Sequence, residues 1–247
     1  MSYKRIIAVL PAYNAAKTLI RTVNDIPRGF VDEIILVDDA SQDDTIVVAR
    51  KLGLKTFVHQ KNLGYGGNQK TCYEEALKSG ADIVVMVHPD HQYDPKAIPQ
   101  LIGLLLNNEC DAAFGSRMIY KDQALAGGMP WWKFYANIFL TKIENLILGL
   151  KLTEYHSGFR AYSKKVLTAV PLEKNSNDFV FDTEIIIQLK ANNFKIKEIP
   201  IKTRYFSEAS MVGLAKSLKY GASIVIVLIK YLLYKSFGLY RGNYFKR

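Results

Sequence analysis

The chain has 247 residues, of which 49% are hydrophobic and 23% charged. This is enough apolar material for one large domain or two small ones, and it excludes a disordered or fibrous protein. The formal net charge of +10 predicts attraction to a polyanion, which is a nucleic acid, an anionic lipid surface or a phosphorylated substrate. Two cysteines and the lack of a signal-peptide pattern after Met1 indicate a reduced, cytoplasmic chain.

The first 120 residues alternate short β-branched runs with segments of helical periodicity, a pattern typical of parallel βαβ units with helices on both faces of the sheet. The predicted strands are residues 5–10, 33–37, 55–58, 83–87 and 111–114. The predicted helices between them are residues 15–26, 43–52, 67–79 and 95–107. We therefore expect an α/β fold with a mixed, mainly parallel sheet, whose ligand site lies beyond the carboxyl ends of the strands.

Polar residues follow the first two predicted strands. Residues 11–14 read Pro-Ala-Tyr-Asn, a turn that places an aromatic ring and an amide where a nucleotide base can rest. Asp38 and Asp39 close the second strand, and their carboxylates suit hydrogen bonds from ribose hydroxyls or a base N–H. Asp43 and Asp44 are better interpreted as caps of the next helix.

A glycine-rich turn follows the third predicted strand. Residues 62–70 read Asn-Leu-Gly-Tyr-Gly-Gly-Asn-Gln-Lys, which can bring backbone N–H groups or the Lys70 ammonium near an anion. Because its spacing matches neither the Walker nor the dinucleotide fingerprint, the turn alone identifies no ligand.

The segment after the fourth predicted strand has the pattern of a metal site. Asp90 and Gln92 are two residues apart, so in an extended segment their oxygens project to one side, with His88 beside them. One carboxylate plus substrate phosphates is the usual set for Mg²⁺, whereas an imidazole is compatible with Mn²⁺. We expect a divalent cation here, Mg²⁺ or Mn²⁺, and interpret His91 as an exposed loop histidine.

Two later segments have apolar faces. Residues 131–147 begin with two tryptophans and fit a core helix or a helix at a membrane interface equally well. Residues 220–234 are almost wholly apolar and are framed by basic residues. As a helix they span roughly 22 Å, short of the ~30 Å hydrocarbon core, with Lys230 inside. We expect this helix to lie on the membrane; the alternative is a core or oligomer-interface helix.

Together these motifs resemble the family 2 glycosyltransferases, whose GT-A fold binds a nucleotide-diphospho-sugar, and among them most of all the polyprenyl-phosphate (dolichyl-phosphate) mannose or glucose synthases. The resemblance extends over residues 5–210 and rests on the order and spacing of five motifs, which are residues 11–14, 37–45, 62–67, 88–92 and Ser-Gly-Phe-Arg at 157–160. The chain departs from the family in having His88 where the metal motif usually begins with Asp, and Ala15 where an acidic residue often follows the Tyr-Asn turn.

The resemblance and the patterns above give a candidate site. Residues expected at the nucleotide-sugar are Pro11, Tyr13, Asn14, Asp38, Asp39, Gly64, Lys70 and Arg204. The expected metal ligands are His88, Asp90 and Gln92, and the candidate catalytic residues are Asp90, Arg117, Arg160 and Asp182. Arg117 is expected to face phosphate or acceptor, and Arg160 belongs to the acceptor-side loop. Asp182 is the candidate general base for a hydroxyl acceptor, since a phosphate acceptor needs none.

The resemblance implies an inverting transfer of a hexose from a GDP- or UDP-linked donor to a polyprenyl phosphate. Residues 1–212 are expected to form the catalytic domain and residues 213–247 a membrane-associating helical segment, which places the protein in the cytoplasm on the inner face of the membrane. Two alternatives remain: transfer to a saccharide or other hydroxyl, and a non-catalytic nucleotide-sugar-binding protein in which His88 marks lost catalysis. Nucleic acid is not expected, because the basic residues gather near apolar segments and no nucleic-acid module is present.

Overall fold

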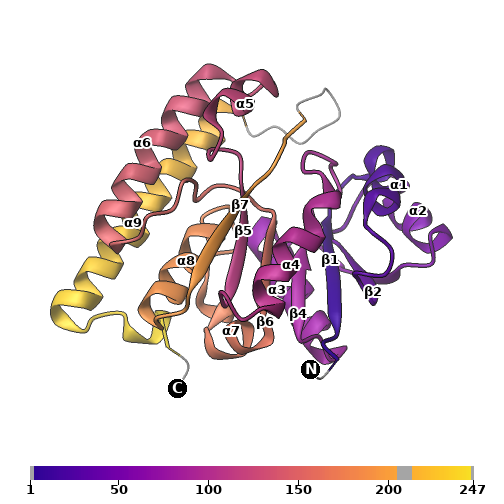
Figure 1. Ribbon diagram of the computed structural model, residues 1–247, viewed down its shortest axis with the longest axis horizontal. Helices are drawn as coiled ribbons and strands as arrows, with labels where there is room; N and C mark the ends of the chain where they lie inside the picture. Colours follow the sequence, from indigo (N-terminus) through magenta and orange to yellow (C-terminus); the bar gives the residue numbers. More distant parts are fainter. Residues whose placement is uncertain (1–2, 205–212, 246–247) are drawn as a thin grey trace.

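The computed structural model describes residues 3–204 and 213–245. Its centre is a seven-stranded sheet in the order β3-β2-β1-β4-β6-β5-β7, in which β6 alone runs antiparallel to its neighbours (Figure 1). The strands are β1 Ile6–Ala12, β2 Glu33–Asp38, β3 Lys55–Val58, β4 Ile83–Met86, β5 Ala112–Ser116, β6 Arg160–Ser163 and β7 Ile196–Pro200. The α/β expectation is confirmed, with each predicted strand found within two residues of its expected ends.

Helices cover both faces of the sheet (Figure 1). Those in the first half are α1 Ala16–Asp25, α2 Thr45–Lys51, α3 Tyr65–Lys78 and α4 Ile98–Leu106. Those in the second half are α5 Lys121–Ala126, α6 Trp131–Leu148, α7 Lys164–Ala169, α8 Phe181–Ala191 and α9 Leu214–Phe237. Strands β1, β2 and β4 are apolar runs because parallel strands between two helical layers are buried on both sides, whereas the edge strand β3 is partly exposed.

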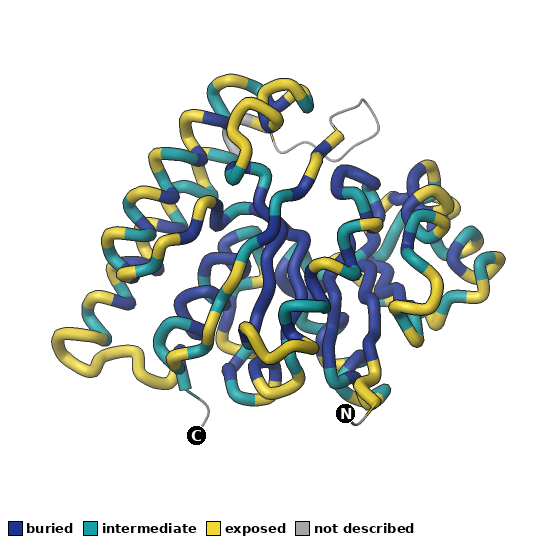
Figure 2. Tube along the Cα trace, in the orientation of Figure 1, coloured by how far each residue is buried: buried dark blue, intermediate teal, exposed yellow. Residues whose placement is uncertain are grey.

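The sheet separates two apolar cores. Side chains alternate along β1, so that Ile7 and Val9 pack in one core while Ala8 and Leu10 pack in the other. The first core is completed by α3, α7, α8 and α9, and the second by α1, α2 and α4. Figure 2 shows the buried strands between partly exposed helices.

The C-terminal helix α9 belongs to the main core on one side only. Ile224, Leu228 and Tyr231 are buried there, and α9 packs against α6 and α8 (Figure 1). The predicted length was wrong: the helix has 24 residues, about 36 Å, because it continues through Lys219 and Lys235 beyond the apolar run. By length and composition its segment Ser217–Phe237 is apolar enough to cross a membrane. Figure 2 shows exposed residues along α9, and Leu218, Val225, Ile226, Ile229 and Leu232 are among them.

Candidate functional site

The ends of β1, β2 and β4 meet at one edge of the sheet, because these strands are parallel neighbours. The turn after β1, the acidic pair at the end of β2 and the loop after β4 therefore lie side by side. This is the position in which open α/β sheets bind ligands. The structure thus brings three of the predicted motifs to one place.

The turn after β1 is held by hydrogen bonds to the segment after β2. Asn14 adopts a positive φ of 52°, its Oδ1 accepts from the backbone N–H of Gln42 at 2.7 Å, and its own N–H donates to Ser41 Oγ at 2.8 Å. Asn14 is thus occupied within the protein, whereas the neighbouring Tyr13 ring is exposed and able to stack on a base.

The two acids after β2 have different surroundings. Asp39 is buried and accepts from the backbone N–H groups of Leu63 at 2.8 Å and Gly64 at 3.0 Å, and from His59 Nδ1 at 2.8 Å. Both its oxygens therefore hold the glycine-rich turn in place. Asp39 was expected to contact the nucleoside; in the structure both its oxygens accept hydrogen bonds from the glycine-rich turn, which makes it a support of that turn.

Asp38 is also buried, but only one of its oxygens is used. Its Oδ2 accepts from the backbone N–H of Ser41 at 2.9 Å, and its Oδ1 has no hydrogen-bond partner among the described residues. A buried acceptor without a partner costs free energy unless a ligand or water supplies a donor. Of the two acids, Asp38 is therefore the one whose carboxylate has an oxygen available to accept a hydrogen bond from a ligand.

Replacing Asp39 by alanine is expected to lower the free energy of unfolding by about 2–4 kcal/mol, because two backbone N–H groups lose their acceptor. Urea denaturation measures the effect. The control is Asp44→Ala, since Asp44 is exposed and its side chain makes no capping hydrogen bond. An unchanged midpoint for Asp39→Ala contradicts the supporting role.

The glycine-rich turn packs against the 175–177 segment. Gly64 has a φ of 86°, and a Cβ there would lie 2.6 Å from the carbonyl oxygen of Asn177. Lys70 Nζ donates to Asn177 Oδ1 at 2.8 Å and also to the Asn175 carbonyl. Burial lowers the pKa of Lys70. Gly64 and Lys70, expected at the nucleotide-sugar, thus join the turn to the segment that leads into α8.

The loop after β4 begins with His88, which lies among aromatic and polar side chains. Its ring stacks on Tyr65 at 5.5 Å between centroids, and its Nε2 is 3.3 Å from the Tyr65 hydroxyl. That hydroxyl donates to Asp182 Oδ2 at 2.6 Å. Gly158 makes room for the imidazole, since a Cβ there would meet Nε2 at 2.3 Å. Burial lowers the pKa of His88, so the ring is neutral at pH 7.

Asp90 forms a compact turn with Gln92. Its Oδ1 accepts from the Gln92 backbone N–H at 3.1 Å, and burial raises the Asp90 pKa. Within residues 3–204 and 213–245, no group of three or more His, Cys, Asp or Glu side chains is placed to hold a metal ion. A carboxylate, an amide and a neutral imidazole in one loop fit a cation that takes its remaining ligands from substrate phosphates.

His91, in the same loop, corrects the sequence interpretation. It is 8% exposed, not an exposed loop residue, and its Nε2 lies 2.9 Å from Asp25 Oδ2. Its positive φ of 57° turns the side chain toward α1. His91 therefore holds the loop after β4 against the end of that helix.

A comparison with protein families identifies the chain. Residues 7–170 match the model of the family described as "Glycosyl transferase family 2", which is more than half of the sequence. The chain belongs to this family. It is therefore a glycosyltransferase, and the expectation of an enzyme is confirmed.

Similar proteins agree with this assignment. The glycosyltransferase is 32% identical to the UDP-N-acetylglucosamine–dolichyl-phosphate N-acetylglucosaminyltransferase of Methanococcus voltae, over 85% of this chain and 90% of the relative. It is 24% identical to the polyprenol monophosphomannose synthase of Mycolicibacterium smegmatis, over 80% and 77%. The glucosyl-3-phosphoglycerate synthase of Mycobacterium tuberculosis, solved with Mn²⁺, UDP and glucosyl-3-phosphoglycerate, shares the fold with a TM-score of 0.66 and 19% identity, over 93% of this chain and 79% of that one. The same synthase has been solved with Mg²⁺ and UDP.

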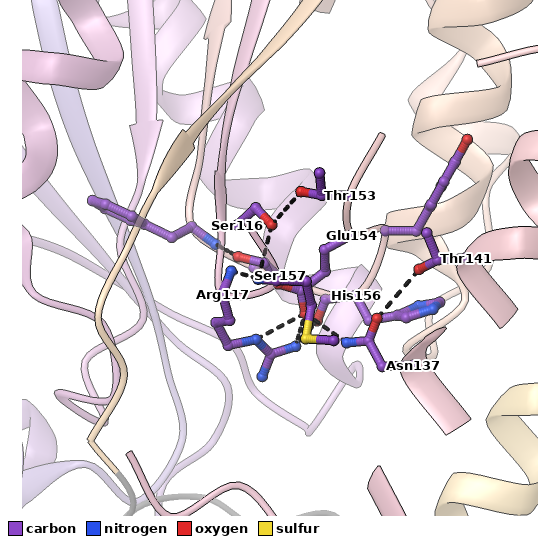
Figure 3. A network of polar contacts seen from close by, with 12 residues as sticks. Ser116, Arg117, Asn137, Thr141, Thr153, Glu154, His156 and Ser157 are labelled. Carbon is purple, nitrogen blue, oxygen red and sulfur yellow. Dashed lines mark hydrogen bonds and ion pairs between the residues drawn. The ribbon is translucent and has the colours of Figure 1, made fainter. Parts of the chain in front are cut away.

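In the glycosyltransferase, the side chains of Arg117 and Arg160 make hydrogen bonds to other residues of the protein. Arg117 Nε donates to Glu154 Oε1 at 2.8 Å, and Asn137 donates to the same oxygen at 2.8 Å (Figure 3). Burial alone would raise the pKa of Glu154, but the Arg117 charge and these hydrogen bonds lower it. The carboxylate is therefore ionised and fixes the Arg117 side chain.

Arg160 is 1% exposed and lies at the start of β6. It donates to the carbonyl oxygens of Ser157 at 2.7 Å, Tyr155 at 2.7 Å and Asp182 at 2.9 Å, and its Nη1 is 3.5 Å from Asp182 Oδ1. These bonds fix the 155–157 segment to the start of α8. The structure accordingly assigns Arg160 the position of a support for Asp182.

Arg204 lies directly beside the loop after β4. Its backbone N–H donates to the Gln92 carbonyl at 2.9 Å, and its guanidinium is 3.1 Å from Asp94 and 3.8 Å from Asp25. The residues after it, including the 207–210 segment that departs from the family pattern, lie outside the described residues.

Several site residues escaped the sequence analysis. Tyr65 links His88 to Asp182, and Asn68 donates to the carbonyls of Ala12 at 3.3 Å and Val37 at 3.1 Å, which ties the ends of β1 and β2 together. Both residues belong to the glycine-rich motif of residues 62–70, but the sequence analysis considered only the glycines and the lysine of that motif. Glu154 stands in no motif.

Proposed function

We propose that this glycosyltransferase transfers a hexose or N-acetylhexosamine from a UDP-linked donor to a polyprenyl phosphate, with inversion at the anomeric carbon. The observation that carries the acceptor is a pair of adjacent helices with exposed apolar side chains, beside the segment that leads into β6. On α6 these are Trp131, Tyr135, Phe139 and Leu146, and on α9 they are Leu218, Val225, Ile226, Ile229 and Leu232.

The exposed apolar side chains of α6 and α9 form a surface of the kind that faces a membrane. Residues four apart in a helix lie on one side, as do the three aromatic residues at 131, 135 and 139. Lys142 and Lys235 are exposed on the same helices and suit anionic head groups. The two relatives named for dolichyl-phosphate and polyprenol substrates support a lipid-linked acceptor. We propose that the protein lies on the cytoplasmic face of the membrane through α6 and α9.

At the donor, the exposed ring of Tyr13 stacks on the base and Asp38 Oδ1 accepts a hydrogen bond from the nucleoside. His88, Asp90 and Gln92 are the residues that would hold a divalent cation, which when bound would supply positive charge to the departing nucleoside diphosphate. The Mn²⁺ and Mg²⁺ present with UDP in the solved synthase support this type of site.

An oxygen of the acceptor phosphate attacks the anomeric carbon opposite the leaving group, and the bond from that carbon to the diphosphate breaks. The acceptor is already anionic, so no side chain has to remove a proton. Asp182 suits a base less well, since it is buried, accepts from Tyr65 and lies beside Arg160. These contacts favour phosphate over a hydroxyl acceptor.

A thermal-shift experiment tests the donor site. UDP with Mn²⁺ or Mg²⁺ is expected to raise the melting temperature, because a ligand at 100 times its Kd adds about 2.7 kcal/mol to the native state. GDP is expected to give a smaller shift, and UDP with EDTA a smaller one still. Equal shifts with and without metal contradict the proposed cation site.

A further inference from the structure

Tyr65, the first residue of α3, joins two parts of the site that are distant in the chain. Its ring stacks on the His88 ring at 5.5 Å between centroids, with the two planes 4° apart, and it also contacts the Phe179 ring at 4.7 Å. Its hydroxyl forms hydrogen bonds with both His88 and Asp182. The donor chemistry described above gives this tyrosine no role.

The hydrogen of the Tyr65 hydroxyl is directed to Asp182. The hydroxyl donates to Asp182 Oδ2 at 2.6 Å, while Asp182 Oδ1 accepts from the Gln69 amide at 3.4 Å and lies 3.5 Å from Arg160 Nη1. All three neighbours are hydrogen-bond donors, and the positive charge of Arg160 favours the ionised form of Asp182. Because an ionised carboxylate has no hydrogen to donate, Tyr65 is the donor in the 2.6 Å contact.

This hydrogen bond decides which nitrogen of His88 carries a hydrogen. A tyrosine hydroxyl has a single hydrogen, so the Tyr65 oxygen can only accept from His88 Nε2, which lies 3.3 Å away. Nε2 is therefore the protonated nitrogen. A histidine that binds a metal ion is neutral and carries one N–H, and the nitrogen without a hydrogen is the ligand atom. In His88 that atom is Nδ1.

The surroundings of His88 fix its ring at the Nε2 edge. A Cβ on Gly158 would lie 2.3 Å from His88 Nε2 and 3.0 Å from the Tyr65 hydroxyl, so the backbone at Gly158 closes over the bond between the two side chains. His88 nevertheless remains partly exposed. Burial raises the pKa of Asp90 and the nearby His88 ring opposes this rise, so the two expected ligands are electrostatic neighbours.

We propose that Tyr65 is a positioning residue, which holds His88 in the tautomer with the hydrogen on Nε2 and thereby leaves Nδ1 to bind the divalent cation. Asp182 contributes by fixing the hydrogen of the Tyr65 hydroxyl. An aspartate can bind a cation through either oxygen, whereas an imidazole binds only in the correct tautomer, so a histidine at position 88 needs such a partner. The proposal rests on the proposed function in taking residues 88–92 as the cation site.

Nitrogen-15 NMR of the full-length protein observes the tautomer directly, with a His88→Gln sample to assign the signals. Without metal, Nε2 is expected to carry the hydrogen and Nδ1 to carry none. Addition of Mg²⁺ with UDP is expected to shift the Nδ1 signal more than the Nε2 signal. A hydrogen on Nδ1, or a larger shift at Nε2, overturns the proposal.

The affinity for Mn²⁺ at saturating UDP, measured by electron paramagnetic resonance, tests the role of Tyr65. Tyr65→Phe keeps the ring and loses only the hydroxyl, and it is expected to weaken Mn²⁺ binding about tenfold, as the loss of a group that orients a metal ligand does. The control is Tyr155→Phe, because Tyr155 is fully buried and its hydroxyl donates to Asn145 at 2.9 Å. The control should bind Mn²⁺ like wild type. Equal losses in the two variants, or none in Tyr65→Phe, contradict the positioning role.

Combining Tyr65→Phe with His88→Ala separates positioning from packing. His88→Ala alone is expected to weaken Mn²⁺ binding. Adding Tyr65→Phe to it should change the affinity by less than about twofold, because no imidazole is left to orient. If Tyr65→Phe costs tenfold in both backgrounds, the tyrosine acts through another residue. If His88→Ala binds Mn²⁺ like wild type, His88 is not a ligand. Either result overturns the proposal.

Sugar transfer by the wild-type protein distinguishes this proposal from the proposed function. If Nδ1 responds to the metal and Tyr65→Phe binds Mn²⁺ more weakly, but wild type transfers no sugar to a polyprenyl phosphate, the proposed function fails and the role of Tyr65 stands. If wild type transfers sugar and Tyr65→Phe binds Mn²⁺ normally, the positioning role fails alone.

Discussion

Replacing Asp90 by asparagine is expected to lower the rate of sugar transfer by about 100- to 1,000-fold, the cost of removing one preorganised charge stabiliser. Asp90 is the only carboxylate in the 88–92 loop, so the amide leaves the proposed cation without an anionic protein ligand there. Asparagine keeps an oxygen for the Gln92 N–H. Because burial already disfavours the charged form of Asp90, the variant is expected to be at least as stable as wild type.

Initial rates at saturating donor, measured over a range of Mn²⁺ and Mg²⁺ concentrations, test this expectation. The matched control is Asp122→Asn, an exposed aspartate in α5, which should transfer sugar at the wild-type rate. If Asp90→Asn keeps full activity and the same metal requirement, the cation is held elsewhere in the protein.

The double substitution Ile226→Glu with Ile229→Glu is expected to weaken binding to anionic liposomes about 100-fold. These side chains are 53% and 50% exposed on α9. Burying each in lipid gains about 1.5 kcal/mol or more, and losing about 3 kcal/mol corresponds to roughly two powers of ten in affinity. Flotation of the full-length protein measures the effect. Deleting α9 is a poorer test, since Ile224 and Leu228 of the same helix are core residues.

A matched control places the same charges on another part of the surface. Ile20 in α1 and Val47 in α2 are 47% and 49% exposed, on helices that pack against the other face of the sheet. Ile20→Glu with Val47→Glu should bind liposomes like wild type. Equal loss in the two double variants means that net charge, and not the surface of α6 and α9, governs membrane binding.

The donor half of the site was predictable because it depends on local rules. Buried strands such as β1 and β2 are apolar runs, and parallel strands end at the same edge, so the polar residues after them must meet there. Asp38 and Asp90 lie at that edge by the connectivity of the strands alone. The same reasoning gave the strand positions to within two residues.

The arginines and the later helices were not predictable in this way. Arg160 is bound by the nearby carbonyls of Tyr155 and Ser157 and by Asp182, 22 residues further on, and no sequence pattern distinguishes these partners from a substrate. The partner of Arg117, Glu154, lies 37 residues further on and has no sequence pattern of its own. The length of α9 was underestimated because lysines continue a helix at its exposed side as readily as leucines do.

The antiparallel direction of β6 separates the 117–159 segment from the strands that precede it in the chain. Arg160, the first residue of β6, pairs with Met86, the last residue of β4, so a segment that precedes a strand reaches the same edge as segments that follow strands. Residues 117–159 leave the sheet after β5 and return at β6 without crossing the strands that carry the donor motifs. If the proposed function holds, exchange of this excursion, with α5 and α6, changes the acceptor side while the strands that carry the proposed donor residues stay in place.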